Sequence, residues 1–209
     1  MKKIISIIAA TLTLTFAAVA QDNPKMETFL GYNFVRFRPD SGFVPSFNAN
    51  GGSGQFVYNF HKWVGAAIDI GAVNKGILNG HDVDTTVMHF VAGPRFSYHN
   101  HTRFTPYGEA LFGGAYGTTS ALISGLPLVG NNLNLDPNLP VTARLTASRT
   151  VFAMMIGGGL DIKLSKHVAF RPAGFDYYLT RVPSVVSNDD INRNNWRYSA
   201  GVNFMFGAR

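Results

Sequence analysis

The sequence predicts an all-β fold, an eight-stranded antiparallel up-and-down transmembrane β-barrel. Apolar and polar residues alternate with a period of two over stretches of ten or more residues, which is typical of strands that separate two environments. Beyond residue 25 no stretch has a convincing helical period, and Gly or Pro interrupts most windows. The predicted connections alternate between long loops and short turns, as they do in transmembrane barrels.

The composition narrows the class of protein further. Only 14% of the 209 residues are charged, against roughly 25% in an ordinary soluble domain. The 13% of aromatic residues argue against disorder. The absence of Cys excludes disulfides, cysteine metal sites, a thiol nucleophile and a lipid-bearing cysteine.

Residues 1–20 are expected to be a cleaved signal peptide. Lys2 and Lys3 precede an apolar stretch, and Ala18-Val19-Ala20 forms a small-residue cleavage site. Removing the two lysines lowers the formal net charge from +6 to +4. No later run of 18 apolar residues could cross a membrane as a helix, so residues 21–209 would enter one only as strands, forming a single barrel domain.

Eight segments carry the strand pattern. The alternation is clearest near the end of the chain, where Trp196, Tyr198 and Val202 share one face and Arg197 lies on the other. The predicted strands are 27–37, 52–60, 63–73, 86–98, 104–116, 151–164, 167–179 and 195–206. The short turns are then 61–62, 99–103 and 165–166, and the long loops are 38–51, 74–85, 117–148 and 180–194. Both termini are expected at the short-turn end.

The two faces of these strands differ in size and polarity. In 27–37, for example, Leu30 and Tyr32 lie on one face and Asn33 on the other. An eight-stranded barrel has room inside only for its own side chains. We therefore expect the bulky face to contact lipid and the small, polar face to fill the lumen. Four cations and three anions belong to the predicted lumen network, which comprises Gln55, Asp69, His89, Arg95, Glu109, Asp161, Lys163, Arg171 and Arg197.

Hairpin registers that pair these polar residues are available. A charge in a narrow lumen needs a partner. In 167–179, Arg171 and Asp176 have opposite parity, which predicts either a bulge between them or a rim position for Asp176. The chosen registers set opposite one another Gln55 and Asp69, Arg95 and Glu109, and Asp161 and Arg171.

Aromatic residues gather near both ends of the predicted strands, as expected of two interfacial girdles. The girdle at the short-turn end is predicted to contain Phe60, Trp63, Phe96, Tyr98, Phe104 and Phe206. The girdle at the long-loop end is predicted to contain Tyr116, Tyr178, Trp196 and Tyr198.

Two further motifs join the signal segment to suggest a family. Thr105-Pro106-Tyr107-Gly108 opens a Gly-rich strand, and the closing strand ends on aromatic alternation up to Phe206. Over residues 25–206 the chain resembles the small outer-membrane β-barrel proteins of Gram-negative bacteria, the class that includes the transmembrane domain of outer-membrane protein A. The resemblance implies an outer-membrane location after Sec-type export, contact with outer-membrane lipid and lipopolysaccharide, and assembly by the barrel-assembly machinery.

The sequence contains few motifs that indicate a catalytic or metal-binding site. No GxSxG, P-loop or HExxH pattern occurs. His99 and His101 give only two metal ligands, and His81 has no Ser fixed beside it as a triad needs. The Asp/Asn-rich stretch 188–195 lacks EF-hand spacing. We predict no catalytic residue, cofactor or metal site, and balanced loop charges give no reason to expect nucleic acid.

The function expected from these features is structural or interactive. A barrel with a polar, plugged lumen would present four loops outside, and the leucine-rich loop 117–148 is a candidate site for a surface ligand. The alternatives are a narrow pore for small solutes, a lipid A-modifying enzyme and a soluble periplasmic barrel.

Overall fold

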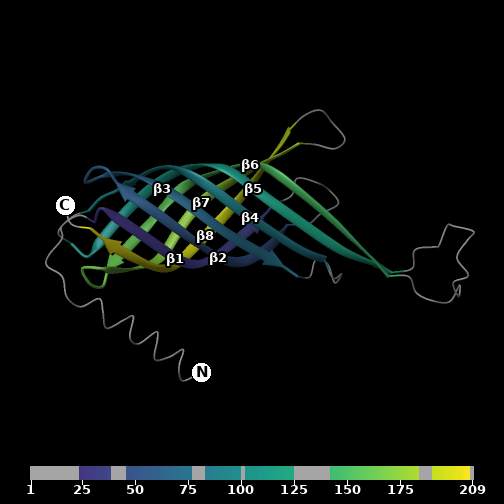
Figure 1. Cartoon of the computed structure of the whole chain (residues 1–209), viewed down its shortest axis with the longest axis horizontal. Helices are drawn as coiled ribbons and strands as arrows, with labels where there is room; N and C mark the ends of the chain where they lie inside the picture. The colour runs from purple at the N-terminus through teal and green to yellow at the C-terminus, as the bar shows by residue number, and fades with distance from the viewer. Residues whose placement is uncertain are drawn as a thin grey trace, which may run out of the picture.

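The computed structural model is a closed barrel of eight strands (Figure 1). The structure describes residues 24–38, 46–76, 83–99, 102–124, 142–183 and 190–207. The predicted signal segment 1–20 lies outside these residues. Every strand pairs antiparallel with its neighbours, and β1 pairs with β8 to close the barrel. The strands are β1 (Met26–Phe37), β2 (Phe47–Asn59), β3 (Val64–Lys75), β4 (Val83–Ser97), β5 (Phe104–Ser124), β6 (Thr142–Lys163), β7 (Val168–Pro183) and β8 (Asp190–Phe206). The predicted fold class and strand count are confirmed.

The two faces of the strands are exposed and buried as the alternation predicts. Leu30 and Phe90 are more than half exposed on the outer wall, whereas Asn33 and Asp69 are buried. In a barrel made of a single sheet, a buried side chain points to the interior, because every strand has only two faces. Among the described residues there is no helix long and apolar enough to cross a membrane.

The predicted registers hold in two hairpins and in part of a third. Gln55 pairs with Asp69, and Arg95 pairs with Glu109. In the β6–β7 hairpin the predicted register holds next to the turn and then slips by one residue across an irregularity in β7 between Arg171 and Gly174. This β-bulge reverses the facing of every later residue of β7.

The first and last described residues of the chain both lie at the short-turn end of the barrel. The Lys25 backbone N–H donates to the Phe206 carbonyl at 3.0 Å, so the first and last described segments lie side by side. Figure 1 shows the short β2–β3 and β6–β7 connections at this same end.

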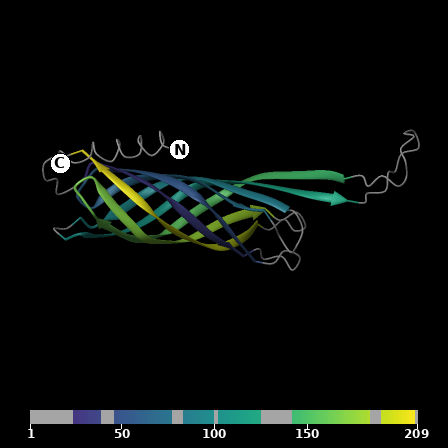
Figure 2. The same ribbon diagram turned by 90° about the horizontal axis from the view of Figure 1, so that it is seen from below.

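The prediction that 117–148 is all loop is wrong. Residues 117–124 continue β5, residues 142–148 continue β6, and the two segments pair from Gly117–Arg149 to Ser124–Thr142. The segments are rich in Thr, Ser and Ala, so they show no clear alternation of bulky and polar residues, although Thr is itself a good strand former. Residues of β4 still pair with β5 as far as Ala121. Figures 1 and 2 show β5 and β6 continuing beyond the other strands as a two-stranded ribbon, the β5–β6 ribbon.

Candidate functional site

The polar interior of the barrel is the candidate site. Eight of the nine predicted network residues are 5% exposed or less: Gln55, Asp69, His89, Arg95, Glu109, Asp161, Arg171 and Arg197. Lys163 differs. It is the last residue of β6 and is partly exposed at the short-turn rim, because a long side chain at a strand end can reach solvent.

Two arginines share one carboxylate at the centre of the network. Arg171 binds Asp161 in a bidentate manner, with Nε donating to Oδ1 at 2.7 Å and Nη2 to Oδ2 at 3.1 Å. Arg95 donates to the same Asp161 Oδ2 at 3.0 Å and to Gln55 Oε1 at 2.5 Å. Gln55 in turn donates to both oxygens of Glu109 at 3.0 Å. These contacts tie β2, β4, β5, β6 and β7 together across the lumen.

Aromatic rings hold the two guanidinium groups in place. The Arg95 guanidinium lies 3.8 Å from the centroid of the Tyr107 ring, and that of Arg171 lies 4.3 Å from the same ring and 4.0 Å from the Phe29 ring. Desolvated cation–π contacts of this kind are worth about 2 kcal/mol or more. The Tyr107 ring has room because Gly174 has no side chain: a Cβ there would lie 2.7 Å from the Tyr107 hydroxyl.

A second group of ion pairs surrounds Arg197. Its Nε donates to Asp176 at 2.8 Å, and its Nη1 donates to Asp69 at 3.1 Å. His89 Nε2 lies 2.6 Å from Asp69 Oδ1. Asp176 is buried rather than at the rim, so the bulge is the correct alternative of the two predicted.

A third group closes around Glu27 near the short turns. Asn59 donates to its Oε1 at 2.8 Å and Asn203 to its Oε2 at 2.7 Å. His99 Nε2 lies 3.2 Å from Oε1, and His99 Nδ1 donates to the Lys62 carbonyl at 3.1 Å. His99 therefore reaches the interior from a turn in which the sequence suggested only a polar connection.

The sequence analysis missed several interior residues. Glu27 shares the parity of Asn33 on the same strand, so the signal was available. Asp176 could not be placed without knowing of the bulge. With these two acids and without Lys163, three buried guanidinium groups face five buried carboxylates, in place of the predicted four cations and three anions.

The interior also contains a large apolar region that the predicted small, polar lumen does not include. Phe37, Phe47 and Val73 lie at the long-loop ends of their strands. Further along the wall, Leu111 is buried and the neighbouring Phe112 is 47% exposed, so bulky apolar residues face both sides of the wall there. The cluster and the residues packed against it are Val35, Phe37, Ala49, Val57, Ala67, Val73, Val91, Leu111, Ala115, Ala153, Met155, Tyr178, Phe47, Val87 and Val151.

No metal centre is evident in the part of the chain that the structure covers. Nowhere among those residues do three His, Asp or Glu side chains lie together in a way that could hold a metal ion. His81, His101 and Asn188-Asp189, which the sequence analysis weighed, lie outside the described residues.

Comparison with known proteins fits this architecture. The model of the family described as "Outer membrane protein beta-barrel domain" matches residues 6–204. The chain belongs to this family. Among solved structures, Neisserial surface protein A is similar with a TM-score of 0.57 and 14% identity, over 87% of this chain and 97% of that one. The attachment invasion locus protein Ail of Yersinia pestis is similar with a TM-score of 0.52 and 18% identity, over 87% of this chain and 99% of that one. No curated protein matches the sequence.

Membership of this family places the protein in the outer membrane. Because outer-membrane barrels have short periplasmic turns and longer extracellular loops, we expect the termini to face the periplasm and the β5–β6 ribbon to extend outside the cell. All six aromatic residues predicted for the periplasmic girdle are 46% exposed or more on the outer wall: Phe60, Trp63, Phe96, Tyr98, Phe104 and Phe206.

The outer girdle is only partly as predicted. Tyr116 and Trp196 are exposed on the wall, and the Tyr198 hydroxyl donates to the Pro172 carbonyl at 2.5 Å. Tyr178 is wrongly assigned. It is 1% exposed and packs against His89 and Phe37 inside the barrel, because the bulge in β7 turns its side chain inward.

Proposed function

We propose that this protein is a non-conducting, non-catalytic outer-membrane scaffold that presents the β5–β6 ribbon for binding at the cell surface. The observation that carries the proposal is the contrast between a filled interior and a long external hairpin. Side chains cross the lumen at several levels, whereas β5 and β6 pair with each other as far as Ser124 and Thr142, past the last residue pair of β4 and β5.

The filled interior supports a lumen closed to ions. Arg95 on β4 bonds to Asp161 on β6, and Arg197 on β8 bonds to Asp69 on β3. Opening a path would leave buried charges without partners, which is strongly unfavourable. The apolar cluster around Leu111 and Met155 forms a second barrier, because it offers no polar groups to a hydrated ion.

The ribbon has the chemistry of an anion-binding surface. Its strand segments contain Arg144 and Arg149 and no acidic residue. The edge of β6 from Thr142 to Val151 has no β7 partner among the described residues, since that pairing begins at Phe152. Unpaired strand edges present backbone N–H donors. Ail has been solved in complex with the heparin analogue sucrose octasulfate, which makes a sulfated glycan the probe of choice.

Heparin binding by the purified mature protein tests this role. The Arg144→Gln/Arg149→Gln variant should bind heparin at least several-fold more weakly, because the charged donors are lost. The matched control, Lys25→Gln/Lys166→Gln, removes the same charge at the periplasmic end and should bind as the wild type does. Equal binding by both variants would refute the ribbon as the site.

A further inference from the structure

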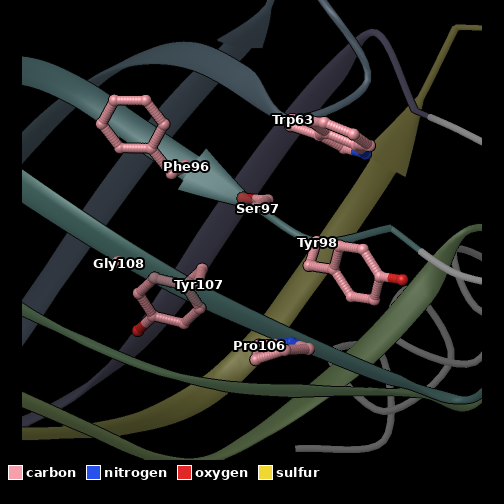
Figure 3. Close-up of a pocket in the computed structure, with 7 residues that line it drawn as sticks. All are labelled: Trp63, Phe96, Ser97, Tyr98, Pro106, Tyr107 and Gly108. Atoms are coloured by element: carbon pink, nitrogen blue, oxygen red, sulfur yellow. The ribbon is translucent and has the colours of Figure 1, made fainter.

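A hollow of about 330 Å³ opens on the outer wall of the barrel near the periplasmic end. It lies between the end of β4 and the start of β5. Figure 3 shows the rings of Trp63 and Tyr98 on the side nearer the turns, Phe96 on the other side, and Pro106 and Gly108 along β5. The hollow therefore faces the lipid at the level of the periplasmic aromatic girdle.

The hollow exists because Gly108 has no side chain. Gly108 is the partner of Phe96 in the β4–β5 ladder and belongs to the outward face of β5. A Cβ added at this position would meet only the Gly157 carbonyl oxygen, at 3.6 Å, an ordinary van der Waals contact. An alanine would therefore fit without moving the backbone, so close packing of the protein does not explain the glycine.

The rim beside the hollow is entirely cationic in the described residues. Lys25, Lys62, Arg103 and Lys166 are its exposed charged residues. The acids near this end of the described strands, such as Glu27 and Asp161, are buried inside.

Two of these cations flank the hollow. Lys62 precedes Trp63, and its carbonyl accepts the His99 Nδ1–H beside Tyr98. Arg103 lies directly before the first residue of β5, on the strand that carries Pro106 and Gly108.

We propose that this hollow is a binding site for an anionic glycerophospholipid of the periplasmic leaflet. One acyl chain would lie in the hollow over Gly108. The phosphate would lie at the rim between Lys62 and Arg103, within reach of the indole N–H of Trp63 and the hydroxyl of Tyr98. Apolar walls below and unopposed positive charge above match a lipid of this chemistry, and each basic side chain near an anionic lipid surface favours binding.

Quenching of Trp63 fluorescence tests the proposal. The chain has two Trp, so Trp196→Phe leaves Trp63, which lines the hollow, as the only Trp fluorophore. This protein is reconstituted in phosphatidylethanolamine with brominated acyl chains, and unbrominated phosphatidylglycerol is added in increasing fraction. The recovery of fluorescence gives the relative association constant of the two lipids at Trp63.

We expect phosphatidylglycerol to be preferred on the order of fivefold, the effect of about one basic group near an anionic lipid. Lys62→Gln/Arg103→Gln should lower the preference to unity, and so should Gly108→Leu, which fills the hollow. Gly114→Leu is the matched control, since this outward glycine on β5 also has room for a Cβ, and it should keep the preference. Lys166→Gln controls for charge in the same way.

A wild-type preference of unity would overturn the proposal. So would an unchanged preference in both the Gly108→Leu and the Lys62→Gln/Arg103→Gln proteins, because the wall would then hold only ordinary boundary lipid. Folding of each variant is checked by the shift in gel mobility on heating. If Gly108→Leu does not fold, Gly108→Ala takes its place with the same expected direction.

Discussion

The barrel interior is filled in two different ways. In what we call the ion-pair half, Arg95, Arg171 and Asp161 fill the lumen with ion pairs that join strands across the barrel. In what we call the apolar half, residues such as Leu111 and Met155 fill it with apolar side chains. The stability of the ion-pair half depends on every charged group keeping its partner, whereas the stability of the apolar half depends on how completely the side chains fill the space. The two halves should therefore respond to mutation by different rules.

The largest effect is expected from breaking the ion-pair half. Arg95→Met should lower the free energy of unfolding by about 3–5 kcal/mol, because it leaves Asp161 and Glu109 buried without one of their cations. Urea unfolding in phospholipid vesicles measures the loss. The double variant Arg95→Met/Asp161→Asn should regain part of the lost stability, because it removes one of the unpaired charges. A loss below about 1 kcal/mol in Arg95→Met alone would contradict the coupled network.

The apolar half should respond to volume alone. Leu111 is fully buried, so Leu111→Ala should cost about 2–4 kcal/mol through lost burial and the cavity left behind. Leu111→Met preserves the volume and should cost less than about 1.5 kcal/mol. The same unfolding assay compares them, and equal losses would show that this half is not packed as the structure describes.

An intermediate effect is expected where the backbone makes room for the network. Gly174→Ala would place a Cβ 2.5 Å from the Ser199 Oγ and 2.7 Å from the Tyr107 hydroxyl. The forced displacement of Tyr107 from the two guanidinium groups should cost about 1–3 kcal/mol. Gly114→Ala on the outer wall meets nothing closer than 3.7 Å and should be close to neutral in the same measurement.

The smallest effect is expected at the rim. Lys163→Met should change the free energy of unfolding by less than about 1 kcal/mol, because ion pairing of a partly exposed charge contributes little to stability. Urea unfolding of this variant beside Arg95→Met separates the rim from the network. A loss of unfolding free energy similar to that of Arg95→Met would show that Lys163 belongs to the buried network, as the sequence predicted.

The difference between the two halves also explains what could be read from the sequence. Alternation of bulky and polar residues identifies a strand and its facing, which is why Gln55–Asp69 and Arg95–Glu109 were paired correctly. A bulge adds one residue without changing composition, so Tyr178 was placed on the wrong face.

The apolar half and the external ribbon lack that contrast between faces. Where Leu111 or Met155 faces inward, both faces of a strand are apolar and the pattern no longer distinguishes lumen from lipid. In the ribbon both faces are small and polar, as at Thr146 to Thr150, so the strands there resembled a loop. Ladder hydrogen bonds, which do not depend on side-chain polarity, continue β5 and β6 beyond their predicted ends.

Ion conductance of the purified wild-type protein in planar lipid bilayers tests the central proposal most directly. If the ion-pair half and the apolar half close the lumen together, the inserted protein should give no conductance steps in salt solution. The Leu111→Ala protein should also stay silent, because the ion pairs alone still cross the barrel. Regular, reproducible steps from the folded wild-type protein would contradict the proposal and establish a pore.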